Sequence, residues 1–199
     1  MNMSGLRAGF AAACICLLAI PASAALKVGD TAPDFTAAGS LGGKRIAFHL
    51  ADALKKGPVV LYFYPSAYTG GCDLEAHTFA GEADKFAAAG ATIIGVSADN
   101  LERLRKFSAD PNFCAGKFSI LSDESTKVAA SYALHVTPPS AGMKDVQGDA
   151  IDHGFIERFT FVIGMDGKIV AAFSSKEDHL SPAEHVSKSL AIAQQIRAE

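Results

Sequence analysis

Residues 59–72 read VVLYFYPSAYTGGC, which is the most informative stretch of the chain. The first six residues form a nearly continuous apolar run rich in β-forming side chains, typical of a strand whose two faces are both covered. A proline and two glycines then predict a loop. From 71 to 89 charged residues separate the apolar positions, which predicts a helix directly after this loop. A buried strand that leads into a helix is typical of an α/β protein.

The same alternation continues toward the C-terminus. Strands are predicted at 92–97 and 118–121, and helices at 100–108 and 125–134. Because a helix connects each buried strand to the next, these strands should pair in parallel.

The last part of the chain predicts a hairpin and a final helix. Residues 158–164 and 168–173 read as two strands, and the Asp166-Gly167 pair between them is a strong two-residue turn signal. Residues 181–184 read SPAE, a capping box with proline at the first helical position, so a helix should begin there. Since a hairpin pairs its strands antiparallel, we expect a central mixed β-sheet flanked by α-helices. The thioredoxin-like arrangement fits this order.

The composition is that of an ordinary globular domain. The chain has 199 residues, of which 49% are hydrophobic and 20% charged. No repeat or low-complexity tract divides it. The 18 Lys and Arg residues against 21 Asp and Glu give a formal net charge of −3. A nucleic-acid-binding protein would normally carry a basic excess, so we expect no nucleic acid as a partner.

Residues 1–24 read as a secretory signal peptide. A single arginine precedes an apolar run, a proline and then small residues suited to cleavage. The run is short for a bilayer-spanning helix, and an uncleaved membrane anchor is the alternative interpretation. Cleavage near Ala24 would remove Cys14 and Cys16 and leave one domain, residues 25–199. We therefore expect a periplasmic or secreted protein without stable membrane association after cleavage.

Cys72 stands where the loop meets the predicted helix. Free backbone N–H groups and the helix dipole favour negative charge there, and a cysteine in this position can have a pKa below the ordinary value of about 8.5. Thr69 lies three residues earlier, where its hydroxyl can turn toward the thiolate, and Pro65 can shield the site from water. A reactive cysteine is the functional interpretation. A half-buried structural cysteine, paired with Cys114 in a disulfide, is the other.

The segment with Pro65, Thr69 and Cys72 resembles the active site of the peroxiredoxins, whose pattern is Pro-x-x-x-Thr/Ser-x-x-Cys after a strand. The resemblance extends over nearly the whole chain after the signal sequence. Residues 158–163 look like the strand that carries the family's active-site arginine. Other similar stretches are 28–35, 94–97 and 121–123.

The resemblance implies a thioredoxin-like fold and a thiol-dependent peroxidase acting on hydrogen peroxide and small organic hydroperoxides. Cys72 would attack one peroxide oxygen and become a sulfenic acid. Arg158 would hold the thiolate and the peroxide through permanently charged donors, and Thr69 would orient the peroxide. Glu75 matches a common acidic position, where it would either support the arginine or be an ordinary carboxylate of the first helical turn.

The cysteine pattern distinguishes among the types of peroxiredoxin. No cysteine follows Cys114, which excludes resolution across a dimer by a C-terminal cysteine. The active-site segment looks most like the Q type, also called the bacterioferritin-comigratory type, although His77 occupies the position where many members have a second cysteine. Cys114 is the remaining candidate to resolve the Cys72 sulfenic acid in an intramolecular disulfide. A thioredoxin-like or glutaredoxin-like reductant would then reduce it. A one-cysteine enzyme is the alternative.

Other functions and ligands fit the sequence less well. A thiol–disulfide oxidoreductase would need a Cys-x-x-Cys pair, which Cys72 does not form. An exported binding module with a structural Cys72–Cys114 disulfide leaves Arg158 without a purpose. The six histidines lack metal-ligand spacing, so we expect neither a metal nor an organic cofactor. Residues 137–139 predict a loop near the site, and 140–154 a surface loop that shapes peroxide access. A monomer or a homodimer is expected.

Overall fold

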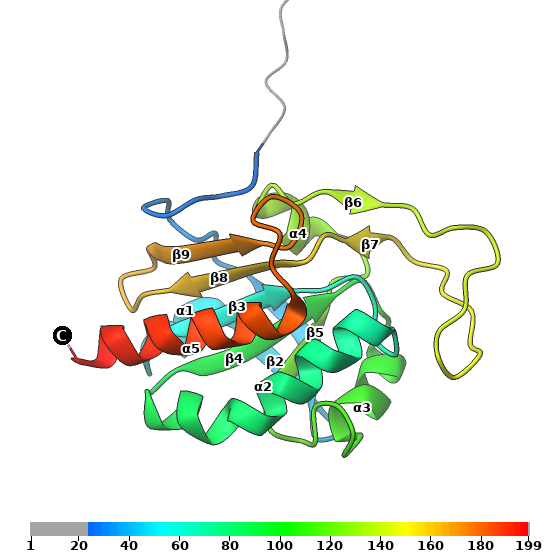
Figure 1. Cartoon of the computed structure of the whole chain (residues 1–199), viewed down its shortest axis with the longest axis horizontal. Helices are drawn as coiled ribbons and strands as arrows, with labels where there is room; N and C mark the ends of the chain where they lie inside the picture. Colours follow the sequence, from blue (N-terminus) through cyan, green and yellow to red (C-terminus); the bar gives the residue numbers. More distant parts are fainter. Residues whose placement is uncertain (1–23, 199) are drawn as a thin grey trace, which may run out of the picture.

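Strand β3 (Val59–Phe63) lies inside a seven-stranded sheet with the strand order β2-β1-β5-β4-β3-β8-β9. The computed structural model describes residues 24–198, and Figure 1 shows the sheet with helices on both faces. The predicted signal peptide, with Cys14 and Cys16, lies outside the described residues except for Ala24. The predicted α/β fold with a thioredoxin-like mixed sheet is confirmed.

Strands and helices alternate through most of the chain, and β6 and β7 form a second, two-stranded sheet. In chain order the other elements are β1 (Thr36–Leu41), β2 (Lys44–His49), α1 (Leu50–Leu54), α2 (Gly70–Ala88), β4 (Thr92–Ser97), α3 (Leu101–Ala109), β5 (Ser119–Ser122), α4 (Lys127–Ser131), β6 (Val136–Thr137), β7 (Phe155–Ile156), β8 (Phe159–Ile163), β9 (Ile169–Ser174) and α5 (Pro182–Ala198).

Side chains of β3 alternate between two apolar cores, one on each face of the sheet. Val60 and Tyr62 belong to a core formed with α2, α3 and α5, whereas Leu61 and Phe63 belong to a core formed with α1 and α4. In Figure 1, α2 and α5 lie side by side across the near face. A shift of β3 by one residue would exchange the two sets, so burial on both faces fixes the register.

Pairing within the sheet is mixed, as the sequence predicts. β3 is parallel to β4 and β4 to β5, whereas β8 is antiparallel to both β3 and β9. The β8–β9 turn differs from the prediction. The Gly164 N–H donates to the Lys168 carbonyl (2.8 Å), which closes a loop of residues 165–167 in place of a two-residue turn. Gly167 has φ +78°, the left-handed conformation typical of such loops.

The hairpin of β1 and β2 has no counterpart among the predicted elements. β1 reads TAAGSL, whose small residues show no clear alternation of apolar and polar side chains. The available signal is the turn, because Gly42 and Gly43 both have positive φ (55° and 79°). Gly39 lets β1 approach β5 closely, since a Cβ atom there would lie 2.4 Å from the Ile120 carbonyl oxygen.

Residues 140–154, here called the β6–β7 loop, run over the surface as predicted. Of residues 141–152 only Asp145 and Ile151 are buried. The predicted loop at 137–139 is wrong at its first residue, because Thr137 pairs with Phe155 in the short second sheet.

Local signals set the ends of the two helices beside the site. At the start of α5, Glu184 Oε2 accepts from the Ser181 N–H (2.8 Å) and Ser181 Oγ accepts from the Glu184 N–H (3.3 Å), which is the predicted capping box. Gly90, with φ +74°, ends α2 and lets the Ala91 N–H donate to the Phe86 carbonyl (2.9 Å). Among the helices of residues 24–198, none is both long and apolar enough to cross a membrane.

Phe79→Ala tests the packing of α2 on the sheet. Phe79 is fully buried against the rings of Tyr62 and Phe86, with centroid distances of 4.5 and 5.7 Å. The substitution should lower the free energy of unfolding by about 3–5 kcal/mol in urea denaturation followed by circular dichroism. Leu74→Ala, on the 50% exposed Leu74 of the same helix, should change it by less than about 0.5 kcal/mol. Equal losses in the two variants would contradict this packing.

Candidate active site

Cys72 lies in the first turn of α2, at the end of the loop that leaves β3. The residue is buried (3% exposed), and its N–H donates to the Thr69 carbonyl (2.8 Å). Thr69 precedes the helix, but its hydroxyl donates to the Ser66 carbonyl (2.7 Å) and does not cap the helix. Pro65 is partly exposed just before Ser66. The loop therefore presents Pro65, Thr69 and Cys72 from one end of β3.

Arg158 reaches the same place from a distant part of the chain. It precedes β8, which pairs with β3 so that Phe159 lies opposite Phe63. Its Nη2 group donates to the Cys72 sulfur (3.1 Å), and its Nη1 group forms an ion pair with Glu75 of α2. Glu75 is fully buried, and its Oε1 atom has no hydrogen-bond partner. The carboxylate therefore lies where it can hold the guanidinium against the sulfur.

Burial raises the pKa of the Cys72 thiol above its ordinary value in this closed geometry. Arg158, the Ser66 backbone and the Thr69 hydroxyl oppose this rise, whereas the charge of Glu75 adds to it. The lowered pKa that a helix N-terminus can give is therefore not found here, because the sequence shows the helix end but not the apolar surroundings. Burial also raises the pKa of Glu75, to about 7, against the opposing effect of Arg158. The Cys72 thiol and the Glu75 carboxyl group, both acids, thus contact the same guanidinium group.

Cys114 lies in the turn after α3 and is fully buried. The His77 ring of α2 donates from Nδ1 to the Asn112 carbonyl (2.9 Å) and joins this turn to the helix that carries Cys72. Burial raises the pKa of the Cys114 thiol well above its ordinary value. Within residues 24–198 both cysteines are free thiols, and they belong to the same apolar core.

A buried histidine behind Arg158 has no signal in the sequence. His185 of α5 lies between the hydroxyls of Thr160 (2.9 Å from Nδ1) and Ser175 (2.9 Å from Nε2). Burial lowers the pKa of His185 to about 4, and the charge of Arg158 acts in the same direction. The ring is therefore neutral near pH 7. Because Thr160 follows Arg158 by two residues, His185 helps to fix the strand that presents the guanidinium.

Four ionisable residues beside the loop of residues 64–69 are also absent from the sequence predictions. Asp99 follows β4, Arg103 lies in α3, and Asp145 and His153 belong to the β6–β7 loop. Arg103 pairs with Asp99 (2.8 Å) and Asp145 (2.7 Å), and His153 pairs with Asp99 (2.8 Å). The one available signal was the position of Asp99 after the carboxyl end of a predicted parallel strand, where functional side chains often gather.

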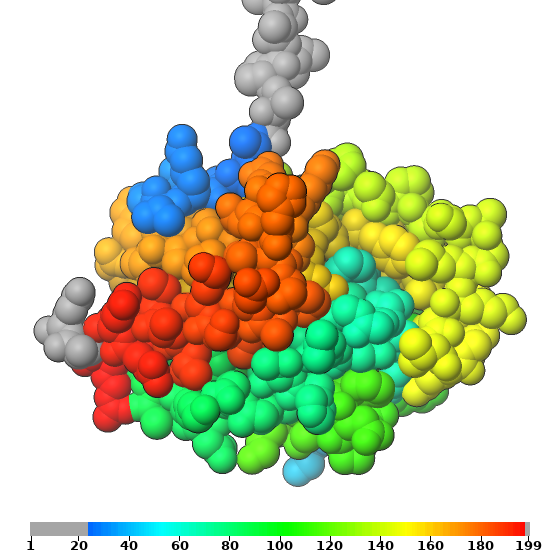
Figure 2. Space-filling view, viewed as in Figure 1, coloured from blue at the N-terminus to red at the C-terminus, as the bar shows by residue number. Residues whose placement is uncertain are grey.

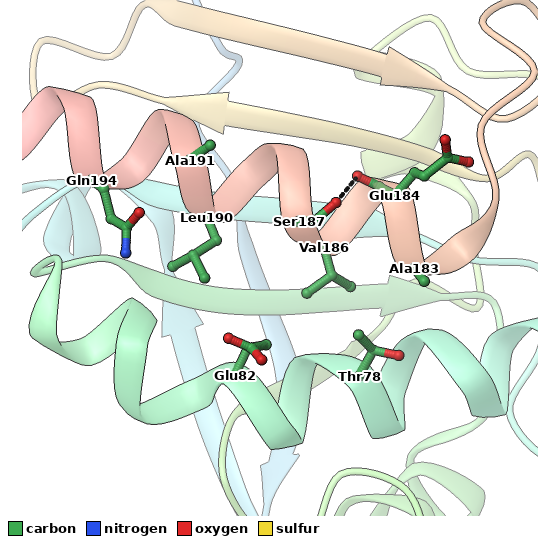
Figure 3. Close-up of a pocket in the computed structure, with 9 residues that line it drawn as sticks. All are labelled: Thr78, Glu82, Ala183, Glu184, Val186, Ser187, Leu190, Ala191 and Gln194. Carbon is green, nitrogen blue, oxygen red and sulfur yellow. Dashed lines mark hydrogen bonds between the residues drawn. The ribbon is translucent and has the colours of Figure 1, made fainter.

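A groove of about 460 Å³ between α2 and α5 is a separate feature (Figure 3). Thr78 and Glu82 line it on one side, and Val186 and Leu190 on the other. None of the residues around Cys72 described above lines this groove. Within residues 24–198, no group of three or more His, Cys, Asp or Glu side chains is placed to hold a metal ion.

An almost buried thiol held by a fixed guanidinium suits attack of the sulfur on a peroxide oxygen, the chemistry of the thiol peroxidases called peroxiredoxins. Residues 28–172 match the AhpC/TSA family. The chain belongs to this family and to its peroxiredoxins, which are oxidoreductases.

Individual relatives agree with this assignment. Peroxiredoxin Bcp of Escherichia coli K12 is 32% identical over 148 residues, which are 74% of this chain and 85% of the relative. Peroxidoxin BcpB of Mycobacterium tuberculosis has 32% identity and a TM-score of 0.68, over 86% of this chain and 98% of that one. The bacterioferritin comigratory protein of Xanthomonas campestris has 27% identity and a TM-score of 0.61, over 80% and 91%. The predicted likeness to the Q, or bacterioferritin-comigratory, type is confirmed.

Arg158→Gln tests the charge at the sulfur. The neutral amide removes a positive charge that lowers the Cys72 pKa, so this pKa should rise further. The reaction of Cys72 with hydrogen peroxide should slow by about 100-fold or more, since a donor to the developing charge is lost. Both measurements use residues 25–199 with Cys114→Ser. Thiolate absorbance gives the Cys72 pKa, and loss of free thiol gives the rate of its reaction with peroxide. Arg45→Gln, at an exposed arginine of β2, is the control. An unchanged Cys72 pKa would contradict the assigned role of the contact.

Proposed function

We propose that this thiol-dependent peroxidase uses Cys72 as its peroxidatic cysteine, with hydrogen peroxide and small organic hydroperoxides as substrates. The supporting observation is the 3.1 Å contact between the Arg158 guanidinium and the Cys72 sulfur. The thiolate attacks one peroxide oxygen and the O–O bond breaks. The departing oxygen takes up a proton and leaves as water or an alcohol, while the sulfur keeps the other oxygen as a sulfenic acid.

The neighbouring residues contribute to this step in different ways. Arg158 stabilises both the thiolate and the charge that develops on the departing oxygen. Glu75 positions the guanidinium through their buried ion pair. The Thr69 hydroxyl orients the peroxide, and the Pro65 ring limits access of water because it has no N–H group to bind it.

We propose further that Cys114 resolves the sulfenic acid. Its sulfur attacks the Cys72 sulfur, a disulfide forms, and the hydroxyl oxygen leaves as water. Burial of both thiols in one apolar core supports this pairing. The first turn of α2 must unwind for the bond to form, since Cys72 is held there by Thr69 and Arg158. A thioredoxin-like or glutaredoxin-like dithiol then reduces the disulfide by exchange.

Export is a separate proposal that rests on the sequence of residues 1–24. With this segment removed, the working protein is residues 25–199, and its only cysteines are Cys72 and Cys114. We propose that it acts in the periplasm or outside the cell, as a monomer or a homodimer.

Cys72→Ser and Cys114→Ser separate the two cysteine roles. Cys72→Ser should abolish peroxide consumption, because no nucleophilic sulfur remains at Arg158. After one equivalent of peroxide, the non-reduced intact mass of the unsubstituted protein should fall by two hydrogens, whereas Cys114→Ser should gain oxygen. Peroxidase activity that survives in Cys72→Ser would refute the proposed nucleophile. A stable sulfenic or sulfinic acid in the unsubstituted protein would instead establish a one-cysteine reaction.

Processing of the N-terminus tests the export proposal. We expect that expression of the full sequence yields, in the cell envelope, a protein with the mass of residues 25–199. Ala24→Arg should block this cleavage, because signal cleavage needs a small residue there. The proposal is refuted if the masses of the unsubstituted protein and of Ala24→Arg both include residues 1–24.

A further inference from the structure

The catalytic loop, residues 64–69, contains a strained residue. Tyr68 has φ +57°, the left-handed region that costs free energy for a residue with a β-carbon. Its carbonyl accepts from the Val146 N–H (3.0 Å), and the Arg103 guanidinium carbon lies 5.3 Å from the centre of its ring. Val146 belongs to the β6–β7 loop, which Figure 2 shows in yellow beside the teal start of α2. The β6–β7 loop thus supports the strained backbone.

Asp99 is fully buried against the catalytic loop. Its carboxylate accepts hydrogen bonds from the Ala67 N–H (2.8 Å), the Ser66 hydroxyl (3.0 Å) and the Ser97 hydroxyl (2.7 Å). It also bonds His153 Nε2 of the β6–β7 loop (2.8 Å). One carboxylate therefore joins the catalytic loop to the β6–β7 loop.

Arg103 makes a second connection between the two loops. Its Nη2 group donates to the Ala67 carbonyl (2.8 Å) and pairs with Asp145, one of the two buried residues in an otherwise exposed stretch. Its Nε atom pairs with Asp99. The contacts of Arg103 with the Asp99 and Asp145 carboxylates lack hydrogen-bond geometry, so the attraction there is between charges. With two acids and Arg103, the cluster is neutral only when His153 is protonated.

The pKa shifts of His153 and Asp99 have the directions of an ion pair. Burial lowers the pKa of His153, but the hydrogen bond and charge of Asp99 outweigh burial and raise it above its ordinary value. Burial raises the pKa of Asp99, but His153, Ala67 and Ser97 outweigh it and lower this pKa. The other charged groups nearby are Glu102 and Lys106 of α3, Asp149 and Asp152 of the β6–β7 loop, and Asp73 of α2 near Arg103 and Asp145.

The sign of the pH dependence follows from these directions. The folded-state pKa of His153 is raised. Protonated His153 therefore stabilises the folded protein fully at a pH below its unfolded-state pKa of about 6.5, and this stabilisation is lost as the pH rises through its folded-state pKa. Asp99, with a lowered pKa, stays ionised throughout this range.

We propose that the β6–β7 loop is a clamp that holds the catalytic loop in its peroxide-reacting form, with His153 and Asp145 as positioning residues. In the closed clamp Tyr68 keeps its strained backbone and Cys72 stays beside Arg158. In the open clamp this strain is released and the first turn of α2 is free to unwind. The effect on catalysis rests on the proposed function, whereas the clamp itself does not.

Hydrogen exchange at single amides, measured by NMR on the reduced full chain without peroxide, tests the clamp directly. The Ala67 amide reports on the Asp99 anchor, and the Cys72 and Asp73 amides, both bonded to the Thr69 carbonyl, report on the start of α2. His153→Ala and Asp145→Asn should each lower their protection by about tenfold or more, while amides of β3 and β8 keep theirs. Lys144→Gln, at an exposed charge of the same loop away from His153, is the matched control and should leave protection unchanged.

A pH series separates positioning by charge from a structural role. Protection of these amides in the unsubstituted protein should fall as the pH rises through the His153 pKa. His153→Gln keeps an N–H donor toward Asp99 without a titrating charge, so this fall should disappear. The clamp would be overturned if His153→Ala lost protection equally in the loop and the sheet, or lost none. It would also be overturned if the protection of His153→Gln still fell with pH as in the unsubstituted protein.

Kinetics link the clamp to turnover. In His153→Ala, oxidation of Cys72 by peroxide should slow, because the site is less often assembled, while the following disulfide should form faster. A parallel slowing of both steps would contradict the clamp. If Cys72→Ser kept peroxidase activity, the proposed function would fail, and the exchange result would still decide the clamp because it needs no turnover.

Discussion

The contact between the Arg158 guanidinium and the Cys72 sulfur joins residues 86 positions apart at 3.1 Å. It is possible only because β8 pairs antiparallel with β3, so that the residue before β8 faces the loop that follows β3. A buried sulfur can carry a negative charge only beside a partner of opposite charge, since desolvation otherwise disfavours the ion. Arg158 supplies that charge, and Glu75 balances it within the core. The pairing of β8 with β3 and the ion pair with Glu75 together place the guanidinium at the sulfur.

Burial has opposing effects in this site. It keeps water from the sulfur and strengthens every charge interaction there, but it also raises the pKa of Cys72. Glu75 shows the same opposition, since its pKa rises to about 7 although Arg158 lies against it. The helix N-terminus alone does not overcome burial. A thiolate at Cys72 is favoured by groups from two places in the chain, Arg158 and the loop around Ser66 and Thr69.

The catalytic loop has two conflicting requirements in the proposed cycle. Attack on a peroxide requires Thr69, Cys72 and Arg158 in fixed positions, whereas a bond to the buried Cys114 requires the start of α2 to unwind. The left-handed Tyr68 and the charges that surround Asp99 bear on both requirements. Strain favours opening, and the contacts from Arg103 and the β6–β7 loop oppose it. The balance between them sets how often the loop opens.

Sequence pattern alone determined the elements whose residues are buried on both faces or carry a strong local signal. Strand 92–97 has the predicted bounds, α2 begins and ends within one residue of prediction, and the capping box starts α5. The motif of Pro65, Thr69 and Cys72 was readable because all three lie within eight consecutive residues. The hairpin of β1 and β2 was not, since small and half-exposed side chains give no periodic signal.

Only the tertiary structure decided which distant groups meet. The ion pair of Glu75 with Arg158, the neutral His185 behind Thr160 and the charge cluster around Asp99 join side chains that are far apart in the chain. Burial, which set the direction of the Cys72 pKa, is likewise a property of packing. Local sequence specifies backbone conformation and the reactive residue types, but electrostatic free energy depends on distances and dielectric surroundings that exist only after the strands have paired.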